Sequence, residues 1–142
     1  MQQALEQEYG IRELPQFIYD ASGKPSLEGR PDIHFSLSHC RLAVACAVSD
    51  HPVGIDIETL DQYDEEVTRH VMNDSEVYQI LNSPHPAIAF TRLWTMKESY
   101  YKLTGNDAAG DIPHLLDHAP HYRFNTVITP RFVYTVCSPS QS

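Results

Sequence analysis

The 142-residue sequence has few cysteines and no long apolar run. Its three cysteines, Cys40, Cys46 and Cys137, are odd in number and form no Cys-x-x-Cys pair, which argues against a disulfide framework or a zinc site. No apolar run approaches the roughly 20 residues that span a bilayer, and no basic-then-apolar leader is visible. We therefore expect no membrane association and a cytoplasmic location.

Basic residues are also scarce, with 10 Lys and Arg against 19 Asp and Glu and a formal net charge of −9 at pH 7. A general nucleic-acid binder needs a basic surface, so we expect no nucleic acid among the partners. The composition, with 42% hydrophobic and 20% charged residues, is typical of a globular chain. Its length suits one domain or two very small lobes that share a core.

The segment 90–105 is predicted to form a helix, because its apolar residues recur at helical offsets and Gly105 can end a helix. Within it Trp94, Glu98 and Lys102 are spaced four residues apart and therefore lie in one row along the helix. In isolation, the two charged residues would be a surface ion pair worth roughly 0.3 kcal/mol. A second acidic motif upstream favours a functional interpretation.

That motif is Val53-Gly-Ile-Asp-Ile-Glu58, which is predicted to be a buried strand. Alternation places its two isoleucines in a core and Asp56 and Glu58 together on the opposite face. Two carboxylates held this close repel one another unless a hard cation such as Mg²⁺ neutralises them. The alternative is an exposed edge strand with solvated acids. Gly54 lets another backbone or a ligand approach closely.

Together, Gly54-Ile-Asp-Ile-Glu58 and Trp94-Thr-Met-Lys-Glu-Ser-Tyr-Tyr-Lys102 resemble the paired signature of the 4′-phosphopantetheinyl transferases. These enzymes move the phosphopantetheine arm of coenzyme A onto a serine of a carrier protein. Phe35-Ser-Leu-Ser-His-Cys40 also resembles the segment before the acidic motif in the two-lobed members that activate peptide synthetases. The resemblance, strong over residues 20–105, implies an α+β fold of two related small lobes.

The resemblance places a partial first lobe at residues 1–52 and the second lobe, with the metal-site motifs, at residues 53–142. The two-lobed relatives carry a further stretch before the helix predicted at residues 2–9, so we expect a shortened N-terminal part and an incomplete first lobe. Another subunit is one possible source of that surface. A two-lobed chain is expected to be a monomer, although an exposed sheet edge would invite pairing.

Three residues are implied by the resemblance to bind coenzyme A in addition to Lys102. Lys24, in a Gly-Lys-Pro element, is expected to contact the nucleotide end, and the alternative is an ordinary turn lysine. Ser38 and His39 are expected to grip the 3′-phosphate, since hydroxyl and imidazole both donate hydrogen bonds. Cys40 stands where relatives commonly have Ser or Thr and is a weaker donor. A hydrolase pair of Ser38 and His39 is disfavoured, because neighbours on a strand point to opposite faces.

The mechanism implied by the resemblance is a Mg²⁺-dependent phosphoryl transfer. Asp56, Glu58 and Glu98 would hold the metal against the pyrophosphate, and Lys102 would offset charge on the bridging and leaving oxygens. Glu98, directly or through a metal-bound water, would take the proton from the carrier serine, and 3′,5′-adenosine bisphosphate would leave. Lys97 lies off this row and is expected to face solvent or a substrate phosphate.

The remaining chain supplies further elements. An apolar strand, Leu42–Val48, is predicted to be buried and to reverse at Ser49–Pro52 into the acidic strand. Arg69 and Arg92 are the basic residues expected near an acidic carrier protein. Other predictions are strands at Gln16–Tyr19, Ile33–Leu37, 122–129 and 131–137, helices at Glu65–Val71 and Glu76–Leu81, and loop from 106 to 120.

Two alternatives to a transferase of the holo-[acyl-carrier-protein] synthase type stay open. One is a non-catalytic fragment that binds coenzyme A or a carrier protein. The other is a Mg²⁺-dependent phosphohydrolase that uses the same carboxylates. The sequence does not distinguish an acyl from a peptidyl carrier.

Overall fold

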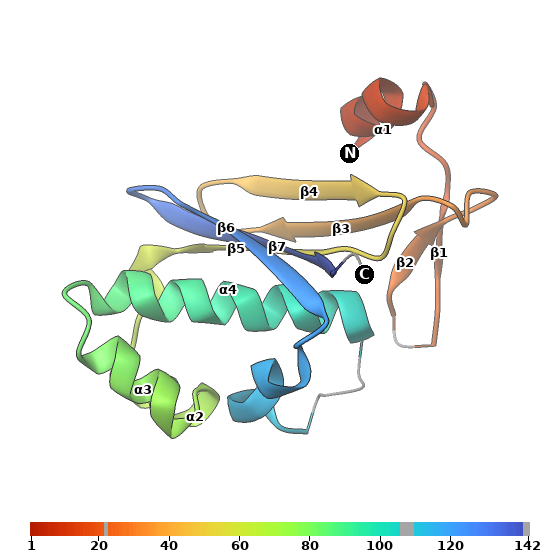
Figure 1. Ribbon diagram of the computed structural model, residues 1–142. Coiled ribbons are helices and arrows are strands. Elements are labelled where there is room, and N and C mark those ends of the chain that lie inside the picture. The colour runs from red at the N-terminus through yellow and green to blue at the C-terminus, as the bar shows by residue number, and fades with distance from the viewer. Residues whose placement is uncertain (22, 106–109, 141–142) are drawn as a thin grey trace.

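A central antiparallel sheet and one long helix organise the computed structural model, which describes residues 1–21, 23–105 and 110–140. The sheet has the strand order β5-β7-β6, formed by Gly54–Thr59, Phe132–Pro139 and Tyr122–Ile128. Helix α4, Pro86–Thr104, packs along β5 and β7 and covers one face of this sheet (Figure 1). The predicted acidic strand and the two C-terminal strands are thereby confirmed.

Helix α4 begins earlier than predicted and ends where predicted. Pro86 occupies its first turn, a position where the fixed φ of proline suits a helix and its missing N–H is not needed. Gly105 ends it with φ 74°. Phe90 and Leu93 pack with Met72 and Ile80 in one core cluster, while Tyr100 and Leu103 belong to a second.

Two short helices lie on the side of α4 away from the sheet (Figure 1). Helix α2, Glu65–Val71, is capped by the Asp64 side chain, and α3, Asp74–Leu81, begins with a capping box between Asn73 and Glu76. Both predicted helices are confirmed. The predicted loop after Gly105 instead contains a 3₁₀ helix, η3, at Ile112–His118. Residues 106–109 of that prediction lie outside the described part of the chain.

The N-terminal part forms two hairpins and a helix. Helix α1, Gln2–Tyr9, ends at Gly10 with φ 68°, as predicted. Strand β1, Phe17–Tyr19, pairs with β2, Pro25–Leu27, and β3, His34–His39, pairs with β4, Val44–Ser49. Their shared core consists of Leu5, Leu27, Ile33 and Phe35. A further 3₁₀ turn, η1 at Leu60–Gln62, follows β5.

The predicted hairpin between the Leu42–Val48 strand and the acidic strand is wrong. Strand β4 pairs with β3, whereas β5 pairs with β7 on one side. On its other side β5 meets β3 through side chains: the Ile55 N–H donates to Ser36 Oγ at 3.0 Å and the Ile57 N–H to Ser38 Oγ at 3.2 Å. With its backbone used in this way, β5 has no place for β4. The apolar strand is also not buried, since Val44 is 80% exposed.

Candidate active site

The acidic motif of β5 and the motif Trp94–Lys102 of α4, called here the lysine motif, lie together where the helix packs against the strand. A Cβ built on Gly54 would overlap the Ser99 carbonyl oxygen and lie 2.9 Å from the Leu103 backbone nitrogen. The sequence predicted that another backbone or a ligand approaches Gly54 closely, and the structure shows that it is the backbone of α4. By letting α4 rest directly on the strand, Gly54 brings the middle and end of the helix to the carboxylates of β5.

Asp56 is buried at the centre of this junction, with 3% of its surface exposed. Its Oδ1 accepts hydrogen bonds from Ser38 Oγ at 3.1 Å and from Lys102 Nζ at 3.3 Å. Burial raises the pKa of Asp56, and the Lys102 ammonium and the Ser38 hydroxyl oppose that rise. Its Oδ2 is buried and has no hydrogen-bond partner among the described residues. The alternative of a solvated edge strand is therefore wrong.

Glu58 and Glu98 add negative charge beside Asp56. Burial, followed by the charges of Asp56 and Glu98, raises the pKa of Glu58 to about 7. Burial and the Asp56 charge likewise raise the pKa of Glu98. The Asp56 charge therefore disfavours ionisation of both glutamates, and the Glu98 charge disfavours ionisation of Glu58, so added positive charge would be favourable at this site.

Lys102 reaches from α4 across the junction. Its Nζ donates to the Leu37 carbonyl of β3 at 3.3 Å, to the Ile55 carbonyl of β5 at 3.1 Å and to Asp56. Its ion pair with Asp56 joins the helix to the sheet, so the surface ion pair considered for an isolated helix does not describe this lysine.

Metal binding by the three carboxylates depends on their spacing and on their donor atoms. Within the described ranges, no three His, Cys, Asp or Glu side chains gather closely enough to form a ready metal site. The donors present are nevertheless all carboxylate oxygens, the type that Mg²⁺ prefers, and one of them, Asp56 Oδ2, is buried without a partner. The residues therefore fit a hard divalent cation that would satisfy this oxygen and offset the excess negative charge.

A cavity of about 270 Å³ lies beside Lys102. Lys24 also lines this cavity, and its Nζ donates a hydrogen bond to the Leu103 carbonyl near the end of α4 at 3.0 Å. Burial lowers the pKa of this lysine. The structure thus brings together two of the predicted coenzyme-binding residues. The full lining is Gly23, Lys24, Pro25, Phe35, Ser36, Leu37, Tyr101, Lys102 and Gly105.

Ser38 and His39 diverge from one another on β3. Ser38 is 8% exposed and its hydroxyl contacts Asp56 and the Ile57 amide, whereas His39 is exposed. Sequence reasoning missed Ser36, which lines the cavity and receives the Ile55 amide. The signal available for it was the Ser-x-Ser alternation, which places both hydroxyls on one face of a strand.

A second cavity, of about 170 Å³, lies between α4 and η3. Trp94, Glu98 and Tyr101 line it from the helix, and Ile112 and Leu115 from η3. Lys97 also borders it. The cavity therefore opens next to the carboxylate that completes the acidic cluster.

The predicted exposure of Lys97 is wrong. Instead of facing solvent or a phosphate, Lys97 is 1% exposed and its Nζ lies 2.7 Å from Glu76 Oε1. The physical reason is its helical position, four residues after Leu93 and seven after Phe90, which are both buried. The lysine thus continues the inward-facing stripe of α4.

Residues 52–136 match the model of the 4′-phosphopantetheinyl transferase superfamily. This range is more than half of the chain and includes every residue of the acidic and lysine motifs. The chain belongs to the 4′-phosphopantetheinyl transferase superfamily. The resemblance inferred from the two motifs and the α+β class of fold are confirmed.

Relatives of known name agree with this assignment. The chain is 39% identical over 85 residues to 4′-phosphopantetheinyl transferase gsp of Aneurinibacillus migulanus, a match that covers 58% of this chain and 35% of the relative. It is 38% identical over 91 residues to 4′-phosphopantetheinyl transferase psf-1 of Bacillus pumilus, covering 63% and 39%. It is 35% identical over 85 residues to 4′-phosphopantetheinyl transferase Sfp of Bacillus subtilis (strain 168), covering 58% and 38%. The match thus spans well under half the length of each relative.

Proposed function

We propose that the chain transfers the 4′-phosphopantetheine arm of coenzyme A to a serine of an apo acyl or peptidyl carrier protein, as a holo-[acyl-carrier-protein] synthase-type enzyme. The observation that carries this proposal is the position of Asp56. Its buried, partnerless oxygen lies in an acidic cluster beside a cavity that two lysines line. Membership of the transferase superfamily supports the same conclusion.

The cavity of Lys24 and Lys102 is the proposed site for the nucleotide part of coenzyme A. Ammonium groups pair with phosphate oxygens, and the cavity walls at Pro25, Phe35 and Tyr101 offer apolar and aromatic surface for a base. Ser38 and His39 flank this region on β3 and stay candidates for contact with the 3′-phosphate. The cavity between α4 and η3, which Glu98 lines, would then receive the acceptor serine of the carrier protein.

Asp56, Glu58 and Glu98 are the residues that would hold Mg²⁺. When bound, the ion would supply positive charge to the pyrophosphate oxygens. Asp56 is already oriented for this role, because Ser38 and Lys102 both hold its Oδ1 and leave Oδ2 available.

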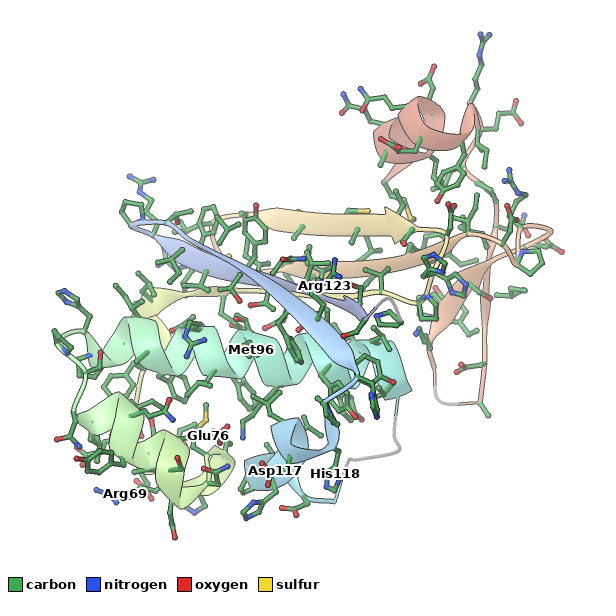
Figure 2. All side chains as sticks on the ribbon, viewed as in Figure 1. Arg69, Glu76, Met96, Asp117, His118 and Arg123 are labelled. Atoms are coloured by element: carbon green, nitrogen blue, oxygen red, sulfur yellow. The ribbon has the colours of Figure 1, made fainter. Side chains whose placement is uncertain are left out.

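The reaction forms a bond from the serine oxygen to the phosphorus nearest the pantetheine arm and breaks the bridging P–O bond. Glu98 takes the serine proton, directly or through a water, and 3′,5′-adenosine bisphosphate leaves with the bridging oxygen. Lys102, whose ammonium already lies at the junction, offsets charge on the leaving oxygens. Arg69, exposed on α2 (Figure 2), and Arg92 of α4 are proposed contacts for the acidic carrier.

The test is mass spectrometry of an apo acyl carrier protein and an apo peptidyl carrier protein after incubation with this chain, coenzyme A and Mg²⁺. A gain of one phosphopantetheine that EDTA abolishes supports the proposal. Absence of the gain on both carriers, with coenzyme A bound in calorimetry, favours a binding fragment. Release of phosphate from coenzyme A without a carrier favours a phosphohydrolase.

The setting proposed for this reaction is a monomer in the cytoplasm, without nucleic acid or membrane. Within the described residues, no helix is long and apolar enough to cross a membrane. Sedimentation velocity tests the oligomeric state, and a concentration-dependent dimer would contradict the monomer.

A further inference from the structure

The ammonium of Lys97 joins three segments of the chain. Besides Glu76 Oε1, its Nζ lies 3.1 Å from the Val71 carbonyl at the end of α2. It also lies 3.0 Å from the Ile112 carbonyl and 2.9 Å from the Pro113 carbonyl at the start of η3. Glu76 projects from α3 toward the space below α4 (Figure 2). An almost fully buried cation with this set of acceptors fixes the positions of the groups around it.

These contacts hold η3 at a defined distance from α4. Lys97 anchors the first residues of η3, and the Tyr100 hydroxyl donates to the His118 carbonyl at its other end at 3.1 Å. Ile112 and Leu115 of η3 line the 170 Å³ cavity together with Glu98 of α4. The width of the cavity beside Glu98 therefore depends on Lys97.

We propose that Lys97 is a positioning residue that, by holding η3 against α4, keeps the cavity beside Glu98 in the shape that admits the acceptor serine. It acts through η3 and touches no substrate, because its ammonium is enclosed by protein acceptors. This inference rests on the proposed function for its effect on transfer. Its effect on η3 is measurable without any substrate.

Two variants distinguish a purely structural role of Lys97 from a role in positioning η3. Lys97→Met alone leaves the buried Glu76 charge without its cation, which destabilises the fold whatever η3 does. The double variant Lys97→Met/Glu76→Gln removes that charge, and its Gln oxygen can still accept the Asn73 N–H of the capping box. Both variants lack the bonds to the Ile112 and Pro113 carbonyls. A matched control is Arg41→Met, which removes the cation of the exposed pair with Asp61.

The experiment measures melting temperature, amide hydrogen exchange of residues 112–118, and steady-state kinetics on the full chain. The single variant is expected to melt lower, and the double variant to recover most of that loss. In both, exchange in η3 should be faster and kcat should fall roughly tenfold or more, because small misplacements beside a reacting group are costly. The KM for coenzyme A should stay unchanged, since Lys24 and Lys102 line a different cavity.

The fluorescence of Trp94 reports independently on the shape of the cavity beside Glu98. Trp94 is the only tryptophan in the sequence and it lines the cavity, so its fluorescence is expected to shift in both Lys97 variants and not in Arg41→Met. Unchanged exchange in η3 and unchanged fluorescence would overturn the positioning role even if the wild-type chain transferred nothing. If the wild type transfers, a stable double variant with wild-type kcat would overturn it as well.

Discussion

The backbone of Gly54 in β5 lies directly against the backbone of Ser99 in α4. The atoms that a Cβ on Gly54 would meet, the Ser99 carbonyl oxygen and the Leu103 nitrogen, are both backbone atoms that cannot turn aside. This contact sets the distance between the helix and the sheet. The same distance allows Lys102 to reach Asp56.

Gly54→Ala is therefore expected to lower the free energy of unfolding by about 3 kcal/mol, the upper part of the usual range for overpacking a core. Urea unfolding followed by circular dichroism measures this. Gly110→Ala is the matched control, because a Cβ there meets nothing within 4 Å and φ is not positive. Equal stability of the two variants would show that α4 does not rest on the strand as described.

Mg²⁺ is expected to stabilise the chain without any substrate, because it offsets the repulsion among the three carboxylates. At tenfold above its dissociation constant the gain is about 1.4 kcal/mol, seen as a rise in melting temperature. Asp56→Asn should abolish this rise.

Glu58→Gln gives a second test of the same repulsion. It removes a charge that burial and Asp56 both disfavour, so it should raise the melting temperature of the metal-free chain and weaken the response to Mg²⁺. A wild-type response to Mg²⁺ in both variants would place the cation elsewhere.

Glu98→Ala should lower the rate of phosphopantetheine transfer by roughly 10²-fold or more, the usual contribution of a positioned acid or base. Its fold should be intact, since Glu98 is only half-buried and borders a cavity. Transfer is followed by mass spectrometry of the carrier and the fold by circular dichroism. Glu28→Ala, at an exposed glutamate away from both cavities, serves as the control. Transfer by Glu98→Ala at the wild-type rate would refute the assigned role.

The thiol of Cys137 is expected to resist modification. It is fully buried in β7, and burial raises its pKa from about 9 to about 12. At pH 8, iodoacetamide should label Cys40 and Cys46, which are partly exposed, well before Cys137. Mass spectrometry of peptides gives the order, and equal labelling of all three in the folded chain would contradict it.

The same pKa predicts a dependence of stability on pH. Because the folded pKa of Cys137 is above the unfolded one, its contribution is complete below pH 9 and is lost as the pH rises toward 12. The loss is at most about 1.4 kcal/mol per pH unit. Cys137→Ala should reduce this slope between pH 9 and 11 in urea unfolding, and an unchanged slope would show that the thiol does not contribute.

Elements set by local signals could be predicted from the sequence. The capping box at Asn73 and the helical spacing through α4 depend on residues close in the chain. The structure has all three helices, α2, α3 and α4, and α4 differs from its prediction at its start, Pro86. The pairing of strands is different, because β5 pairs with β7, more than 70 residues later. An apolar run and a turn signal at Ser49–Pro52 predicted a hairpin that this long-range pairing overrides.

The candidate site was predictable as a set of residue types but not as a geometry. The spacing of the two motifs predicted that Asp56 and Lys102 belong to one active site, and the structure joins them in an ion pair. The burial of Lys97 could not be predicted, because its acceptors come from α2, α3 and η3 and no local pattern places them at its ammonium. The coenzyme-binding and metal-binding roles, and the division into two lobes, stay predictions.

The hydroxyls of Ser36 and Ser38 have a consequence for association between molecules. The amides of Ile55 and Ile57 lie along the side of β5 that faces away from β7, and each donates to a serine. Amides left open along a strand edge would recruit a strand from another chain. The two serines occupy these donors, so the central sheet is protected on that side against edge-to-edge aggregation.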